Sequence, residues 1–76
     1  MPHIEIKCFP GRSEEQKKLL AQKVAQDTAE ILNSKISSVS VVIKDVEEDN
    51  WKEEVWDKQI LADKDFLYKK PGYEIK

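Results

Sequence analysis

The chain has 76 residues, of which 39% are hydrophobic and 37% charged, and its formal net charge at pH 7 is −2. Basic and acidic residues are mixed along the sequence, so nothing indicates nucleic-acid binding, and no apolar run reaches the roughly 20 residues that span a bilayer. The single cysteine, Cys8, excludes an internal disulfide and gives no metal-ligand spacing, and a start without a signal-peptide pattern leads us to expect a cytoplasmic protein.

The first predicted element is a strand over residues 2–9. Apolar and polar residues alternate in it, which places one set on each face: Ile4, Ile6 and Cys8 against His3, Glu5 and Lys7. Ser13 and Gln16 then have the spacing of a capping box, in which each side chain bonds the backbone of the other. The spacing predicts a helix that begins at Glu14.

Apolar and small residues then recur at intervals of three and four, the pattern of an amphipathic helix: Leu20, Ala21, Val24, Ala25, Thr28, Ile31 and Leu32. The period fades at Asn33, which we expect to adopt the left-handed conformation that ends many helices. The β-branched run from Ser38 to Val46 predicts a second strand. Because Val42 and Val46 lie on the face opposite Val39, Val41 and Ile43, this strand is expected to be covered on both faces.

A strand, a long helix and a strand in this order form a βαβ unit, whose strands are parallel and whose crossover is right-handed. Two strands make a marginal sheet, and a chain of this size buries only about 60% of its unfolded surface. We therefore predict an α+β fold in which two such units share one four-stranded sheet in a homodimer. The chain is expected to be a single domain, 1–76, with the βαβ unit at 2–46 and a short helix and tail at 47–76.

The C-terminal part is predicted to contain a short amphipathic helix. Asn50 and Glu53 have the spacing of a helix start, and Trp51, Val55 and Ile60 would lie near one side with Trp56 on the flank. This helix is expected to cover the second face of the sheet. The tail after it is expected to bend at Pro71 and Gly72.

Pro2 is the residue with the most distinctive chemistry. A proline inside a chain has no N–H to donate, but removal of Met1 would make Pro2 a free secondary amine. Apolar surroundings and a nearby cation lower the pKa of such an amine, and Arg12 is the candidate cation. The neutral amine could then act as a general base near neutral pH. If Met1 is retained, the Pro2 nitrogen is an amide and cannot act as a base.

These residues resemble the 4-oxalocrotonate tautomerase family. The resemblance covers residues 2 to about 51 and consists of Pro2 after Met1, the run Gly11-Arg12-Ser13-Glu14-Glu15-Gln16-Lys17, and the Ser-Val-x-Val strand at 38–41. It implies a tautomerase with Pro2 as catalytic base, Arg12 as the anchor of a substrate carboxylate and Trp51 as an aromatic wall. It also implies dimers or larger assemblies, a small enol or 2-oxo acid substrate, and no cofactor or metal.

Ser40 is the main departure from the family pattern. It stands where the best-known members carry a second arginine, and a hydroxyl cannot pair with a carboxylate as a guanidinium does. The longer C-terminus is similar to the dimeric bacterial subgroup with phenylpyruvate-enol tautomerase activity. The resemblance therefore implies a mono-acid enol with an apolar or aromatic body as substrate.

Two other functions stay open from the sequence. One is a non-enzymatic dimeric binding module on the same fold, which is suggested by Ser40 in place of the second family arginine. The other is a hydratase or dehalogenase-like relative, which would need an acidic residue such as Glu5, Glu47 or Asp49 to activate water. His3, the only histidine, is interpreted as structural or solvent-facing and is left out of the mechanism.

Overall fold

The strands β1 (His3–Cys8) and β2 (Ser40–Asp45) pair in parallel, as predicted. In their register His3 lies opposite Ser40 and Cys8 lies opposite Asp45. The computed structural model describes residues 1–76, and the chain forms two compact units, 1–45 and 46–76. The prediction of one domain divided near residue 46 stays a prediction.

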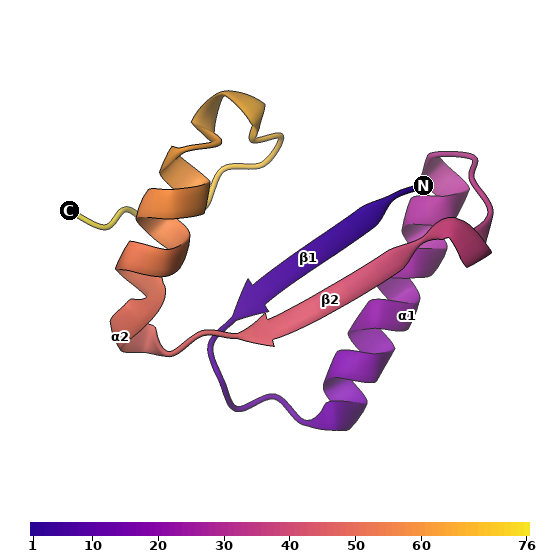
Figure 1. Ribbon diagram of the computed structural model, residues 1–76, viewed down its shortest axis with the longest axis horizontal. Helices are drawn as coiled ribbons and strands as arrows, with labels where there is room; N and C mark the ends of the chain where they lie inside the picture. The colour runs from indigo at the N-terminus through magenta and orange to yellow at the C-terminus, as the bar shows by residue number, and fades with distance from the viewer. The chain divides into compact units, whose positions relative to one another are not determined.

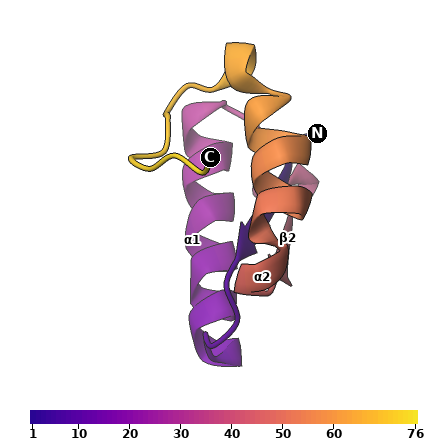
Figure 2. The same ribbon diagram turned by 90° about the vertical axis from the view of Figure 1, so that its left-hand side faces the viewer.

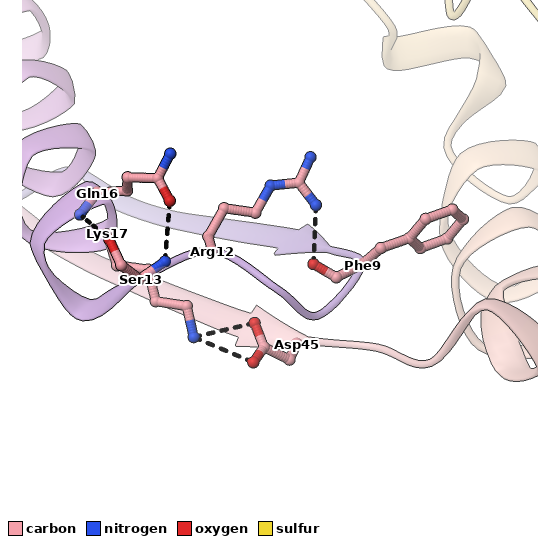
Figure 3. A network of polar contacts seen from close by, with 6 residues as sticks. All are labelled: Phe9, Arg12, Ser13, Gln16, Lys17 and Asp45. Atoms are coloured by element: carbon pink, nitrogen blue, oxygen red, sulfur yellow. Dashed lines mark hydrogen bonds and ion pairs between the residues drawn. The ribbon is translucent and has the colours of Figure 1, made fainter.

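The helix α1 (Glu14–Ile31) connects the two strands and runs along one face of their sheet (Figures 1 and 2). It begins where the sequence predicts, because the capping box is complete (Figure 3). The Ser13 hydroxyl accepts the N–H of Gln16 over 3.1 Å, and the Gln16 side chain accepts the N–H of Ser13 over 2.9 Å. These two bonds satisfy backbone donors that a helix start otherwise leaves without partners.

The end of α1 is also as predicted. Asn33 has a φ of 54°, in the left-handed region. Its N–H donates to the carbonyl of Glu30 over 3.3 Å, and the N–H of Ser34 donates to the carbonyl of Ala29 over 2.9 Å. This pair of bonds is the Schellman motif, which turns the chain away from the helix axis. The turn leads through the short 3-10 helix η1 (Ile36–Ser38) into β2, so the second strand begins later than predicted.

The apolar stripe predicted for α1 is at least half-buried at its smaller residues, as expected, but exposed at its large ones. Ala29 is buried and most of the remaining contact face is half-buried: Lys17, Ala21, Val24, Ala25 and Thr28. Leu20, Ile31 and Leu32 are exposed in the single chain, with Ile31 at 80% exposure. The small side chains at intervals of four let the helix lie close to the strands, which leaves the larger ones on its flank.

The second unit begins with α2 (Glu48–Trp51), so the predicted helix start at Asn50 is wrong. Glu47 is extended, with φ −61° and ψ 145°, and the helix begins directly after it. Glu48 and Asp49 thereby lie in the first turn, where the positive end of the helix dipole favours carboxylates. This favourable placement competes with the capping pattern that the spacing of Asn50 and Glu53 suggests.

The helix continues as the π-helical segment η2 (Lys52–Leu61), which is followed by the 3-10 turn η3 (Lys64–Phe66). The large apolar residues of this region are spaced by four and five positions: Trp51, Val55, Trp56 and Ile60. A winding with i to i+5 bonds is wider than an α-helix and gathers residues at that spacing on one side. Val55 and Trp56 are both buried, so Trp56 does not lie on the flank as predicted.

The tail packs back on this helix through Tyr73. The Trp51 indole N–H donates to the Tyr73 hydroxyl over 3.0 Å, and the rings of Trp56 and Tyr73 lie 5.3 Å apart at an angle of 38°. The chain bends at Gly72, where a turn was predicted. One tyrosine therefore holds both tryptophans of the second unit. No helix of the chain is long and apolar enough to cross a membrane.

Candidate active site

Pro2 lies at the start of β1 and is half-buried. Its carbonyl accepts the backbone N–H of Ser40 over 3.1 Å, which extends the ladder of parallel bonds by one residue. The Pro2 nitrogen is joined to Met1, which is fully exposed. Removal of Met1 would leave the Pro2 amine next to a strand that is fixed on the carbonyl side of Pro2.

Next to Pro2, the side chains of His3 and Ser40 contact each other across the two strands. The Nδ1 atom of His3 lies 2.6 Å from the Ser40 hydroxyl oxygen, which is a hydrogen-bond distance. The sequence did not indicate this pair. The two residues are 37 positions apart, and only the strand register brings them together.

Arg12 lies in the exposed loop between β1 and α1. Gly11, with a φ of 118°, turns the chain in a conformation that other residues rarely adopt. The Arg12 guanidinium donates from Nη1 to the carbonyl of Phe9 over 3.0 Å (Figure 3). This contact orients the guanidinium and uses one of its five N–H donors, so a forked edge is left for a carboxylate.

Within one chain, Pro2 and Arg12 are not brought together. Pro2 precedes the first residue of β1, and Arg12 follows its last residue. The six residues of the strand span about 20 Å at about 3.3 Å each. This separation places Arg12 away from Pro2 of the same chain, and the role of Arg12 as the cation beside Pro2 stays a proposal.

The loop that carries Arg12 is held at its far end by an ion pair. Lys17, in the first turns of α1, reaches both carboxylate oxygens of Asp45 at the end of β2, at 3.0 and 3.1 Å (Figure 3). The hydrogen bond that Lys17 donates to Asp45 raises the pKa of its ammonium above the ordinary value of 10.5. The pair ties the start of the helix to the edge of the sheet.

Trp51 belongs to the second unit, where it is the last residue of α2 and is half-buried. Its indole N–H is bound to Tyr73, so its ring is held by the tail. The same unit contains an open hollow of about 640 Å³ lined by Trp56, Ile60 and Tyr73 among others, but not by Trp51. The role of Trp51 as a wall of the substrate site stays a proposal.

The acidic residues considered for water activation have other surroundings. Glu5 lies on the sheet face opposite α1 and pairs with Lys44 at 3.2 Å and Lys7 at 3.9 Å. Glu47 directly precedes α2 and its side chain makes no capping hydrogen bond, and Asp49 lies in the first turn of that helix. No group of three His, Cys, Asp or Glu side chains gathers in a way that could hold a metal ion.

Comparison with known families decides the class of protein. The family described as tautomerase enzyme matches residues 2–55, so the match begins at Pro2 and includes both strands and α1. The chain belongs to the tautomerase family. It is accordingly an isomerase, as predicted, and the resemblance to 4-oxalocrotonate tautomerases is confirmed.

Individual relatives agree with this assignment. The chain is 47% identical over 76 residues to Tautomerase PptA of Enterobacter sp. (strain 638), with 99% of this chain and 100% of the relative covered. It is 41% identical over 76 residues, with the same coverage, to Tautomerase PptA of Escherichia coli O139:H28 (strain E24377A / ETEC). These tautomerases match along their full length, including the part after residue 55.

A solved structure supports the fold. The chain is similar to one of the 4-oxalocrotonate tautomerase isozymes from Methylibium petroleiphilum, with a TM-score of 0.63 and 38% identity. The similarity covers 66% of this chain and 81% of that one. The predicted α+β fold with parallel strands is therefore confirmed, while the shared sheet of a dimer stays a proposal.

Proposed function

We propose that this tautomerase interconverts the enol and keto forms of small 2-oxo acids in the cytoplasm, with Pro2 as the proton carrier. The observation that carries the proposal is the position of Pro2 at the first residue of the family match, with its carbonyl fixed to β2 by Ser40. After loss of Met1, Pro2 would carry the only backbone amine of the chain, since every other backbone nitrogen is an amide. That amine would lie directly before an ordered strand. It needs no cofactor to move a proton.

The proposed reaction moves one proton in two steps. The neutral Pro2 nitrogen takes the proton of the enol oxygen as the oxygen–carbon double bond forms and the carbon–carbon double bond opens. The protonated amine then gives a proton to the neighbouring carbon, which completes the keto acid and restores the base. The forked edge of Arg12 would hold the carboxylate and fix the enol against the amine.

A site with both residues would have to be shared between two chains. A two-fold axis perpendicular to the sheet would make the strands of two copies antiparallel, so the Pro2 end of one copy would meet the Arg12 end of the other. The exposed residues Leu20, Ile31, Leu32 and Ile36 supply apolar surface that self-association could cover. A homodimer with two such sites, formed on one four-stranded sheet, fits a separation of about 20 Å better than a monomer does.

The substrate class follows from the charges of the site residues. Arg12 is the only arginine of the chain, so one guanidinium per site is available for one carboxylate. Ser40 adds no charge at the position of the second family arginine. We therefore propose a mono-acid with an apolar or aromatic body, for which Trp51 would supply one wall, and phenylenolpyruvate is the probe that fits these features.

Mixing two inactive variants tests both the residues and the shared site. Pro2→Ala and Arg12→Ala should each lower kcat/KM for phenylenolpyruvate ketonisation, followed by ultraviolet absorbance, and Arg12→Lys should restore part of the loss. If a site takes Pro2 from one chain and Arg12 from the other, a mixed dimer has one intact site. Unfolding and refolding the two variants together at equal concentration should then recover about a quarter of the wild-type activity.

The outcomes separate the possible functions. If each site took Pro2 and Arg12 from the same chain, every site in a mixed dimer would carry one defect and mixing would recover no activity. No recovery on mixing would therefore contradict a shared site. Full activity of Pro2→Ala would exclude the proline base, and a wild type with a free Pro2 but no turnover would favour a binding module. Release of halide from a halogenated acrylate without ketonisation would favour the dehalogenase-like alternative.

A further inference from the structure

His3 and Ser40 form a side-chain pair directly beside Pro2. Their Nδ1 and hydroxyl oxygen lie 2.6 Å apart, and their α-carbons face each other in the parallel register. The backbone N–H of the same Ser40 donates to the carbonyl of Pro2 over 3.1 Å. Ser40 thus contacts the two residues at the start of β1 through its main chain and its side chain.

We propose that His3 and Ser40 are a positioning pair that fixes the Pro2 amine for proton transfer. The inference rests on the proposed function of Pro2 and adds two residues to it. Neither residue is proposed to touch the substrate or to exchange a proton with it. Their role is to fix the first pair of residues in the parallel ladder, directly next to the Pro2 amine.

The need for such a pair follows from the chemistry of proline. Pro2 has no N–H to donate once it is in the ladder, and as a free amine its nitrogen must stay unbonded to act as a base. Pro2 therefore makes its backbone contact with β2 through its carbonyl, and the next residue of the strand, His3, pairs with Ser40. Displacement of a reacting group by about 1 Å can cost on the order of 100-fold in rate. Weaker pairing of His3 with Ser40 would therefore lower the rate of proton transfer.

The contact is compatible with either tautomer of the His3 ring. The Nδ1 atom can donate to the Ser40 oxygen or accept the Ser40 O–H, according to which ring nitrogen carries the hydrogen. A hydroxyl is both donor and acceptor, whereas an arginine side chain at position 40 could only donate. Serine at position 40 is therefore suited to pairing with His3.

The test compares kinetic constants of matched variants. Ser40→Ala and His3→Phe remove the contact, whereas Ser40→Thr keeps the hydroxyl, and His3→Asn keeps a polar atom at the position of Nδ1. The first two should each lower kcat for phenylenolpyruvate by about tenfold with KM within about twofold, and the other two should stay within about twofold of wild type. Lys23→Ala, which changes an exposed lysine in the middle of α1, should leave both constants unchanged.

The double variant His3→Phe/Ser40→Ala completes the cycle. Residues that act as one unit give a double variant no slower than either single variant, and this is the expected result. Additive losses, a loss in KM instead of kcat, or no loss at all would each overturn the positioning role while Pro2→Ala remained inactive. An inactive wild type or an active Pro2→Ala would instead contradict the proposed function, and the inference with it.

Discussion

The backbone N–H of Ser40 donates to the carbonyl of Pro2 over 3.1 Å and ties the start of β2 to the start of β1. This bond connects the two positions at which the sequence is most informative about function. One is the proposed base, and the other is the position at which a second arginine would be expected from the family pattern. In this chain position 40 supports the proline strand through a backbone bond and a contact with His3.

Ser13→Ala should destabilise the chain through the start of α1. The substitution removes the hydroxyl that accepts the N–H of Gln16, and losing such a cap costs about 1 kcal/mol. Urea unfolding followed by circular dichroism measures the change. Ser37→Ala in the exposed turn before β2 is the matched control and should change the free energy of unfolding by less than about 0.5 kcal/mol. Equal effects of the two variants would contradict the capping role.

The pair of Lys17 and Asp45 predicts a dependence of stability on alkaline pH. Because the hydrogen bond to Asp45 raises the pKa of Lys17 in the folded chain, its contribution is fully present below the unfolded pKa of 10.5. The contribution is lost as pH rises through the higher folded pKa. The difference in unfolding free energy between wild type and Lys17→Gln should therefore be constant from pH 7 to about pH 10 and shrink above it.

Lys18→Gln provides the comparison for this experiment, since Lys18 is an exposed neighbour on the same helix. Its unfolding free energy should follow that of the wild type across the same pH range. High salt should also reduce the effect of Lys17→Gln, because ions screen a pair near the surface. A difference that grows above pH 10 would show that the pair does not stabilise the fold.

Tyr73→Phe should loosen the contact between the tail and the helix of the second unit. The variant loses the hydroxyl that accepts the Trp51 N–H and keeps the ring that lies against Trp56. A hydrogen bond of this kind contributes about 0.5 to 1.5 kcal/mol. Tryptophan fluorescence during urea unfolding measures the loss, and Tyr68→Phe is the control because Tyr68 is fully exposed. A Tyr68→Phe effect as large as that of Tyr73→Phe would contradict the assignment.

Gly11→Ala should disturb the loop that orients Arg12. Apart from Gly11 and its two chain neighbours, no atom lies within 4 Å of the position that a new Cβ would occupy, so the expected cost comes from the φ of 118° alone. Such a sparsely populated backbone conformation costs a non-glycine residue about 1 to 3 kcal/mol. If Arg12 anchors the substrate, KM for phenylenolpyruvate should also rise. Gly72→Ala, which has open space and no unusual φ, should leave both stability and KM unchanged.

Local signals in the sequence predicted the local structure well. The spacing of Ser13 and Gln16 specified the start of α1, and Asn33 marked its end, because both features depend on bonds within a few residues. The helix start at Glu48 was missed because two competing signals lie within one turn. The spacing of four and five between Trp51, Val55 and Ile60 was a visible sign of the wide winding of η2.

The candidate site was harder to predict because it depends on long-range geometry. The contact of His3 with Ser40 follows from the strand register, which no local pattern of the two strands specifies. The length of β1 was predictable, and it already implied that Pro2 and Arg12 lie at opposite ends. A shared site would reconcile that separation with the roles that the family resemblance gives to both residues.

The most direct test of the central proposal combines intact mass with ketonisation kinetics for the wild type and Pro2→Ala. The wild-type mass should show loss of Met1, and phenylenolpyruvate should be ketonised without added cofactor or metal. Pro2→Ala, with the same mass processing and the same circular dichroism spectrum, should lose at least about 100-fold in kcat/KM. A processed Pro2→Ala variant that ketonises phenylenolpyruvate as fast as the wild type would contradict the proposal.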